Sequence, residues 1–181
     1  MQIQDKLSVL ARIARAFSER GISWALGASA MLYLRGVTPD FHDLDLLTTQ
    51  SDFPAAQEVL AGLGTLLPPR KNALYRTEHF LECVVDGVEI DLMANFTILH
   101  SGAEHRFPLE ECGAPDFANV LGEAVPLQSL SLWRECYRLM GRAEKVRAID
   151  RWLDRRTPAA DGNTARAKAA QPNNYKGEIK A

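Results

Sequence analysis

The segment His42-Asp43-Leu44-Asp45-Leu46 alternates acidic and apolar residues. In a β-strand, side chains two positions apart lie on the same face, so Asp43 and Asp45 are expected to project together while Leu44 and Leu46 are buried. Two carboxylates held this close repel each other, and a cation between them relieves the repulsion. Mg²⁺ prefers oxygen ligands of this kind. The segment therefore predicts a strand, at 44–48, that begins at a divalent-metal site.

A third carboxylate, Asp91, lies on another strand with the same alternation. Residues 88–94 place Val88, Ile90 and Leu92 on one face and Asp91 on the other. The preceding dipeptide Asp86-Gly87 is a strong hairpin signal, because a type I′ turn needs positive φ at both of its central residues. We therefore expect a hairpin of strands 79–85 and 88–94, with Asp91 on its second arm.

Upstream of the acidic pair, the segment Gly27-Ala28-Ser29 separates an apolar strand, 22–26, from a helix that ends near Gly36. Backbone N–H groups at the start of a helix are free to bind a phosphate group. Gly27 and Ser29 are accordingly candidate phosphate-binding residues. The order along the chain is a glycine-containing turn, an acidic pair on the next strand, and a third acid on a later strand.

The remaining periodicity predicts further helices around this sheet. Apolar residues recur at helical spacing over 7–17 and over 130–140, a helix capped by Ser51-Asp52 ends at Gly64, and a last helix covers 146–153. A short strand is expected at 74–77, whereas 97–123 is weakly patterned. The fold class is therefore α/β or α+β, a mixed β-sheet flanked by helices with a helical C-terminal piece.

Length and composition limit the classes of function. The 181 residues fit one domain, which we place at 1–156, and 157–181 contains too few large apolar residues to fold, so it is expected to be a flexible tail. Lys and Arg total 21 against 23 Asp and Glu, which gives no strong nucleic-acid signal. The three cysteines are widely spaced, and no segment resembles a signal peptide or a membrane span. These features are typical of a cytoplasmic protein.

With these residues in place, the sequence resembles the DNA polymerase β-like nucleotidyltransferase superfamily. The stretches that match its pattern are 24–30, His42-Asp43-Leu44-Asp45-Leu46 and Glu89-Ile90-Asp91-Leu92. The single-domain size and the trailing helices are most similar to the small antibiotic-modifying (lincosamide, aminoglycoside) and toxin-type members. The segment 141–145, which contains Arg142 and Lys145, is similar to a basic C-terminal helix found in several such groups. Ala28 stands where the pattern has a second Gly or Ser.

The resemblance implies a catalytic and metal-binding triad of Asp43, Asp45 and Asp91, two Mg²⁺ ions, and an NTP donor. It also implies Gly27, Ser29, Arg142 and Lys145 as nucleotide-binding residues. The expected reaction transfers a nucleoside monophosphate, most often AMP, to a hydroxyl of a small-molecule, protein or tRNA acceptor. In-line attack at the α-phosphorus expels pyrophosphate, and metal ions lower the pKa of the attacking hydroxyl and neutralise the leaving group.

Other residues have both a functional and a structural interpretation. His42 contacts the nucleotide or is a loop histidine without a role. The spacing of His100, His105 and Cys112, with Glu110 and Glu111 nearby, fits no standard zinc pattern. Trp24, Trp133 and Trp152 fall on apolar periodicity, which is more typical of a core than of a base-stacking surface. Further cations that could contact a triphosphate, or simply be solvated, are Arg35, Lys71 and Arg147.

Two classes of function stay open at this point. The first is a metal-dependent nucleotidyltransferase, which the three convergent acids favour. The second is a non-catalytic module of the same fold that acts as an antitoxin, a regulator or a nucleotide-binding protein, with a partner protein in a toxin–antitoxin-type pair. Ala28 in the glycine-containing turn favours the second.

Overall fold

A computed structural model of the chain describes residues 2–68 and 74–156, so the segment expected to be a tail lies outside the described residues. The helices of the described part are α1 (Ile3–Glu19), α2 (Ala28–Leu34), α3 (Phe53–Leu63), α4 (Leu130–Leu139) and α5 (Ala143–Asp154), with a 3₁₀ turn at Leu109–Glu111. The strands are β1 (Trp24–Leu26), β2 (Leu44–Thr48), β3 (Thr65–Leu66), β4 (His79–Val85), β5 (Val88–Ala94), β6 (Phe96–His100), β7 (Ala103–Phe107), β8 (Asp116–Val120) and β9 (Glu123–Leu127).

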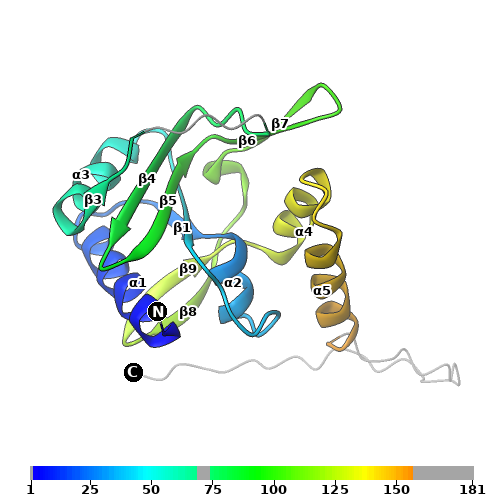
Figure 1. The fold of residues 1–181 in the computed structure, drawn as a ribbon, viewed down its shortest axis with the longest axis horizontal. Helices are drawn as coiled ribbons and strands as arrows, with labels where there is room; N and C mark the ends of the chain where they lie inside the picture. Colours follow the sequence, from blue (N-terminus) through cyan, green and yellow to red (C-terminus); the bar gives the residue numbers. More distant parts are fainter. Residues whose placement is uncertain (1, 69–73, 157–181) are drawn as a thin grey trace, which may run out of the picture.

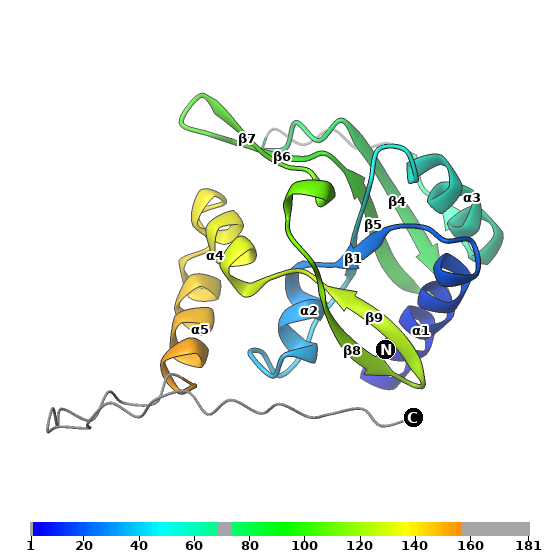
Figure 2. The ribbon, with the colours of Figure 1, turned by 180° about the vertical axis from the view of Figure 1, so that it is seen from behind.

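Seven of these strands form one mixed sheet in the order β3-β4-β5-β2-β1-β9-β8, and β6 pairs with β7 in a separate hairpin. β2 runs parallel to β5 and antiparallel to β1, while β4 and β5 are antiparallel. Figure 1 shows that α1 and α3 lie on one side of the sheet, whereas α4 and α5 form a helical hairpin on the other side; Figure 2 shows the same arrangement from behind. The mixed α/β class expected from the sequence is confirmed.

The apolar side of the sheet forms the core together with α1 and α3. Leu44, Leu46 and Ile90 are fully buried, and they pack in one cluster with Phe17 and Leu60 from the two helices. Burying one such side chain stabilises the fold by about 1.5–3 kcal/mol. Because side chains alternate along a strand, burial of these residues directs Asp45 and Asp91 to the opposite face.

The hairpin that carries Asp91 has the expected bounds and turn. Asp86 and Gly87 have φ values of 49° and 81°, as a type I′ turn requires, and Val85 pairs with Val88 across it. The two-residue turn fixes the register of the whole hairpin, so it determines which residue of β4 lies opposite Asp91.

Two local expectations were wrong, and a segment without a clear sequence-based prediction contains strands. The weakly patterned segment 97–123 contains β7, β8 and most of β6, and residues 74–77 form only an isolated bridge between Tyr75 and Ile98. Asp52 precedes α3 but makes no side-chain cap; its Oδ2 instead accepts a hydrogen bond from the Ser23 N–H at 3.0 Å.

No helix in residues 2–68 and 74–156 is both long enough and apolar enough to cross a membrane.

Candidate functional site

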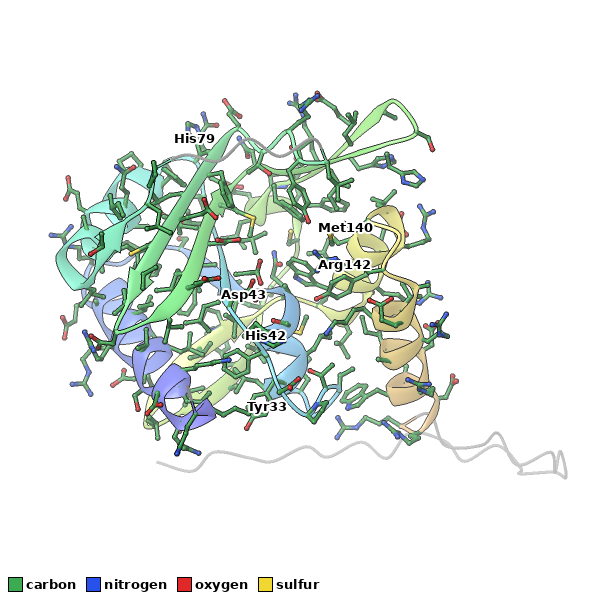
Figure 3. The ribbon with its side chains drawn as sticks, viewed as in Figure 1. Tyr33, His42, Asp43, His79, Met140 and Arg142 are labelled. Atoms are coloured by element: carbon green, nitrogen blue, oxygen red, sulfur yellow. The ribbon has the colours of Figure 1, made fainter. Side chains whose placement is uncertain are left out.

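A pocket of about 540 Å³ opens between the acidic face of the sheet and the α4–α5 hairpin. The acidic, polar and basic residues that were singled out from the sequence and that line it are Ser29, His42, Asp43, Asp45, Asp91, Arg142 and Lys145. Figure 3 shows Asp43 on the sheet side and Arg142 on the helical side. Residues more than a hundred positions apart in the chain are therefore brought to one cavity.

The acids on the sheet side form a row across three neighbouring strands. Asp45 of β2 is the register partner of Asp91 of β5, and Asp91 is in turn the register partner of Glu82 of β4. All three line the pocket. Glu82 was not singled out from the sequence, although the signal was present, because a two-residue turn at Asp86-Gly87 pairs residue 82 with residue 91.

Asp43 and the glycine-containing turn are linked by hydrogen bonds. The Ser29 hydroxyl donates to Asp43 Oδ1 at 3.2 Å, and the Gly27 N–H donates to the Asp45 carbonyl oxygen at 2.9 Å. These bonds attach the start of α2 to the acidic strand. In this structure Ser29 therefore orients a carboxylate, and Gly27 does not line the pocket.

The backbone of the turn is strained at Ala28, whose φ of 43° lies in the left-handed region. Gly27 has an ordinary φ, but a Cβ at this position would lie 2.7 Å from Cε2 of Trp133 and 2.8 Å from its Nε1. Glycine is required here because the indole of α4 packs directly on the turn. Strain of this kind persists where the surrounding structure holds it in place.

Asp45 is a pocket acid with a perturbed pKa. Burial raises its pKa well above the ordinary value, and the negative charges of Asp43 and Asp91 raise it further, whereas Arg142 lowers it. The cause is physical crowding of like charges in a site partly removed from water. The metal-free carboxylate is therefore destabilised in its ionised form.

The helical side of the pocket is cationic and aromatic. Arg142 stands at the N-cap of α5 with its guanidinium 6.0 Å from the ring centroid of Tyr137, and Lys145 follows in the first turn. Phe96 stacks on Trp133 at 5.9 Å, and Tyr75 packs against Phe96 at 5.8 Å. The interpretation of Trp133 as a core residue holds, since it is 2% exposed, yet its ring also lines the pocket.

The other candidates do not join this site, apart from His42. The Arg35 guanidinium donates to the Gln128 carbonyl oxygen and pairs with Asp116, both at 2.9 Å, so it serves the fold. His100 and His105 lie 6.2 Å apart between ring centroids, but Cys112 lines a different cavity. Lys71 lies outside the described residues.

The acids of the pocket have the chemistry of divalent-cation ligands. Within residues 2–68 and 74–156, no three His, Cys, Asp or Glu side chains stand close enough together to form a ready metal cluster. The donor set nevertheless suits Mg²⁺, because Asp43, Asp45 and Asp91 are all hard oxygen ligands that line one pocket. The charges of Asp43 and Asp91 contribute to the raised pKa of Asp45, which indicates that these carboxylates repel each other without a cation.

Comparison with known proteins supports the same class of fold. No family model and no curated protein matches the sequence. Among solved structures, a candidate nucleotidyltransferase from Thermotoga maritima superposes with a TM-score of 0.66 at 22% identity, over 86% of this chain and 97% of that one. The complex of ANT(2″)-Ia with adenylyl-2″-tobramycin superposes with a TM-score of 0.56 at 12% identity, over 82% of this chain and 90% of that one.

The chain therefore has the nucleotidyltransferase fold, as the resemblance of its sequence predicted. In both superpositions, at least nine tenths of the solved structure is covered. At this level of identity the comparison establishes the fold. Activity depends on the residues of the pocket, because one fold hosts many functions.

Proposed function

We propose that the protein is a metal-dependent nucleotidyltransferase that transfers a nucleoside monophosphate from an NTP to a hydroxyl group. One observation carries this proposal: Asp43, Asp45 and Asp91 line the same pocket as Arg142 and Lys145. Acids on one side and cations on the other are the charges that a metal–triphosphate complex needs.

Asp43, Asp45 and Asp91 are proposed to hold two Mg²⁺ ions, which when bound supply charge neutralisation at the triphosphate and a lowered pKa at the acceptor hydroxyl. The Ser29 hydroxyl keeps Asp43 in position through its hydrogen bond to Oδ1. Asp91 is proposed to assist removal of the proton from the acceptor hydroxyl, since it lies at the middle of the acidic row.

Arg142 and Lys145 are proposed to bind the triphosphate from the helical side. Both line the pocket, and both lie at the start of α5, where the backbone dipole also favours an anion. Gly27 is proposed to act indirectly, because its missing side chain lets Trp133 pack on the turn that carries Ser29. These residues orient the leaving pyrophosphate and exclude water from it.

AMP is the proposed group transferred, and ANT(2″)-Ia, solved with an adenylylated product, supports this choice. The acceptor is proposed to be a small molecule, a protein or a tRNA. A decisive test incubates the protein with Mg²⁺, each α-labelled NTP in turn and a cell extract, and asks which molecules acquire label. Transfer from ATP by the wild type and none by Asp45→Asn supports the proposal; equal labelling by both proteins contradicts it.

One observation favours a second candidate, a non-catalytic nucleotide-binding module with a regulatory or antitoxin role. Ala28 occupies the strained position of the turn, and its methyl group has no hydrogen-bonding capacity toward a phosphate. In that case Mg²⁺ and ATP still bind, but no label is transferred to any component of the extract. The same incubation therefore separates the two candidates.

A further inference from the structure

Tyr137 of α4 is a buried polar side chain that faces the pocket. It is 1% exposed and lines the cavity, where its ring is held between Trp133, at 5.5 Å, and the guanidinium of Arg142, at 6.0 Å between the guanidinium carbon and the ring centroid. Within the described part of the chain, its hydroxyl has no hydrogen-bond partner.

This hydroxyl differs from the other polar groups on the same wall. The Tyr75 hydroxyl donates to Met140 Sδ at 3.1 Å, and the Trp133 indole N–H donates to Gln128 Oε1 at 2.6 Å. The side chain is almost completely covered, but its oxygen is not among the fully buried atoms without a partner in the described residues, so it is accessible from the pocket. A ligand in the pocket can therefore accept a hydrogen bond from it.

The surrounding charges indicate which part of a ligand meets this hydroxyl. Besides burial, the negative charges of Asp45 and Asp43 on the sheet side raise the pKa of the Tyr137 phenol, and the positive charge of Arg142 on the helical side lowers it. A metal–triphosphate complex lies with its cations against the acids and its phosphate oxygens toward the cations. A neutral donor between the two layers faces phosphate oxygen. Burial and the nearby carboxylates also raise the pKa of Tyr137, so its proton stays in place.

We propose that the Tyr137 hydroxyl donates a hydrogen bond to a phosphate oxygen of the bound NTP and positions the triphosphate between the acids and Arg142. The inference rests on the proposed function, and it assigns a positioning residue that the alternating acids of the sequence do not reveal. Hydrogen bonds to a charged phosphate oxygen are stronger than those between neutral groups. Removing such a hydrogen bond should therefore weaken nucleotide binding by a measurable factor.

The test is Tyr137→Phe, which removes the hydroxyl and keeps the ring between Trp133 and Arg142. Tyr33→Phe is the matched control, because Tyr33 is a half-buried tyrosine that packs on Phe41 of the loop before β2 and does not line the pocket. Calorimetric titration with two probes, Mg²⁺ with α,β-methylene-ATP and Mg²⁺ with inorganic tripolyphosphate, measures binding without turnover. We expect Tyr137→Phe to bind both probes about ten-fold or more weakly than the wild type.

The control variant should bind both probes as the wild type does, and the melting temperature of ligand-free Tyr137→Phe should not fall. Loss of affinity for the ATP analogue alone would place the hydroxyl at the base or ribose and overturn the assignment to phosphate. Unchanged affinity for both probes would overturn the inference while leaving the proposed function intact. A wild type that binds neither probe would overturn the proposed function together with the inference.

Discussion

At the scale of single residues, the pocket contains a carboxylate and a backbone conformation that each lower the stability of the ligand-free fold. Asp45 carries a raised pKa because it is partly buried beside Asp43 and Asp91. Ala28 stands in a left-handed conformation next to the residue that positions Asp43. Such costs recur at functional sites, where the geometry needed for binding is held by the surrounding structure.

The pKa of Asp45 predicts how stability depends on pH in the metal-free protein. A carboxyl whose pKa is raised by folding lowers stability while it is ionised, and this loss disappears as the pH falls through the raised pKa toward the ordinary value of about 3.9. Asp45→Asn removes the charge at every pH. We expect the variant to melt a few degrees above the wild type near neutral pH, with the difference shrinking as the pH falls.

Glu89→Gln is the control for this measurement, because Glu89 is exposed on the neighbouring strand β5 and does not line the pocket. Melting followed by circular dichroism in the presence of a chelator, across the acidic to neutral range, gives the comparison. A difference between Asp45→Asn and wild type that stays constant with pH would contradict the prediction.

The contact between Gly27 and Trp133 predicts a packing effect. Gly27→Ala places a methyl group against the indole, so the variant should lose about 1–3 kcal/mol of unfolding free energy. Gly62→Ala is the matched control within α3, where nothing lies within 4 Å of the added carbon and alanine should stabilise the helix by about 0.5–1 kcal/mol. Urea denaturation checks both. Equal stability of Gly27→Ala and wild type would show that the turn and α4 do not pack closely.

At the scale of elements, the hairpin β4–β5 determines the arrangement of the acids. We predict that Gly87→Val costs at least about 1 kcal/mol, because a β-branched residue resists the φ of 81° that the turn requires. Asp86→Asn should be tolerated, since Asn adopts positive φ readily. Chemical denaturation of both variants tests the turn. An unchanged Gly87→Val would mean that the turn does not determine the register of Asp91.

The strands that sequence reasoning missed have turns with weaker signals than Asp86-Gly87. β6 and β7 are joined by Ser101-Gly102, and β8 and β9 by Leu121-Gly122; the first residue of each turn has φ near 50°. Leucine is not typical of that conformation, so the sequence pattern does not predict a hairpin there. By contrast, β2, β4 and β5 were predicted with their observed bounds, because each alternates clearly beside a strong turn or acidic motif.

The site residues that the sequence predicts also have strong local signals. Asp43, Asp45 and Asp91 stand out because they interrupt apolar strands. Arg142 and Lys145 stand out because they lie three residues apart in a segment that is similar to a basic C-terminal helix of the resembling superfamily. Their common pocket agrees with that pattern, while their roles stay predictions. Tyr137 was hidden, because a tyrosine on the buried side of an amphipathic helix has the periodicity of a core residue. Only the three-dimensional structure distinguishes a core position from a pocket wall.

At the scale of the whole molecule, the sheet supplies the acids and the α4–α5 hairpin supplies the cations. α5 packs chiefly on α4, and Trp133 of α4 packs on the turn at Gly27 and on Phe96 of β6. The two sides of the pocket therefore come from parts of the chain that are far apart in sequence. A ligand that bridges them binds only the native arrangement, so it should stabilise the whole protein by mass action.

Thermal unfolding with Mg²⁺ and ATP tests the central claim most directly, because it needs no knowledge of the acceptor. At ATP concentrations about 100 times Kd, binding stabilises the wild type by about 2.7 kcal/mol. For a domain of this size that is a rise in melting temperature of about 5–10 °C. Glu89→Gln should show the same rise, whereas Asp45→Asn should show almost none. If wild type and Asp45→Asn respond identically to Mg²⁺ and each NTP, the acids do not hold a metal–nucleotide complex and the account fails.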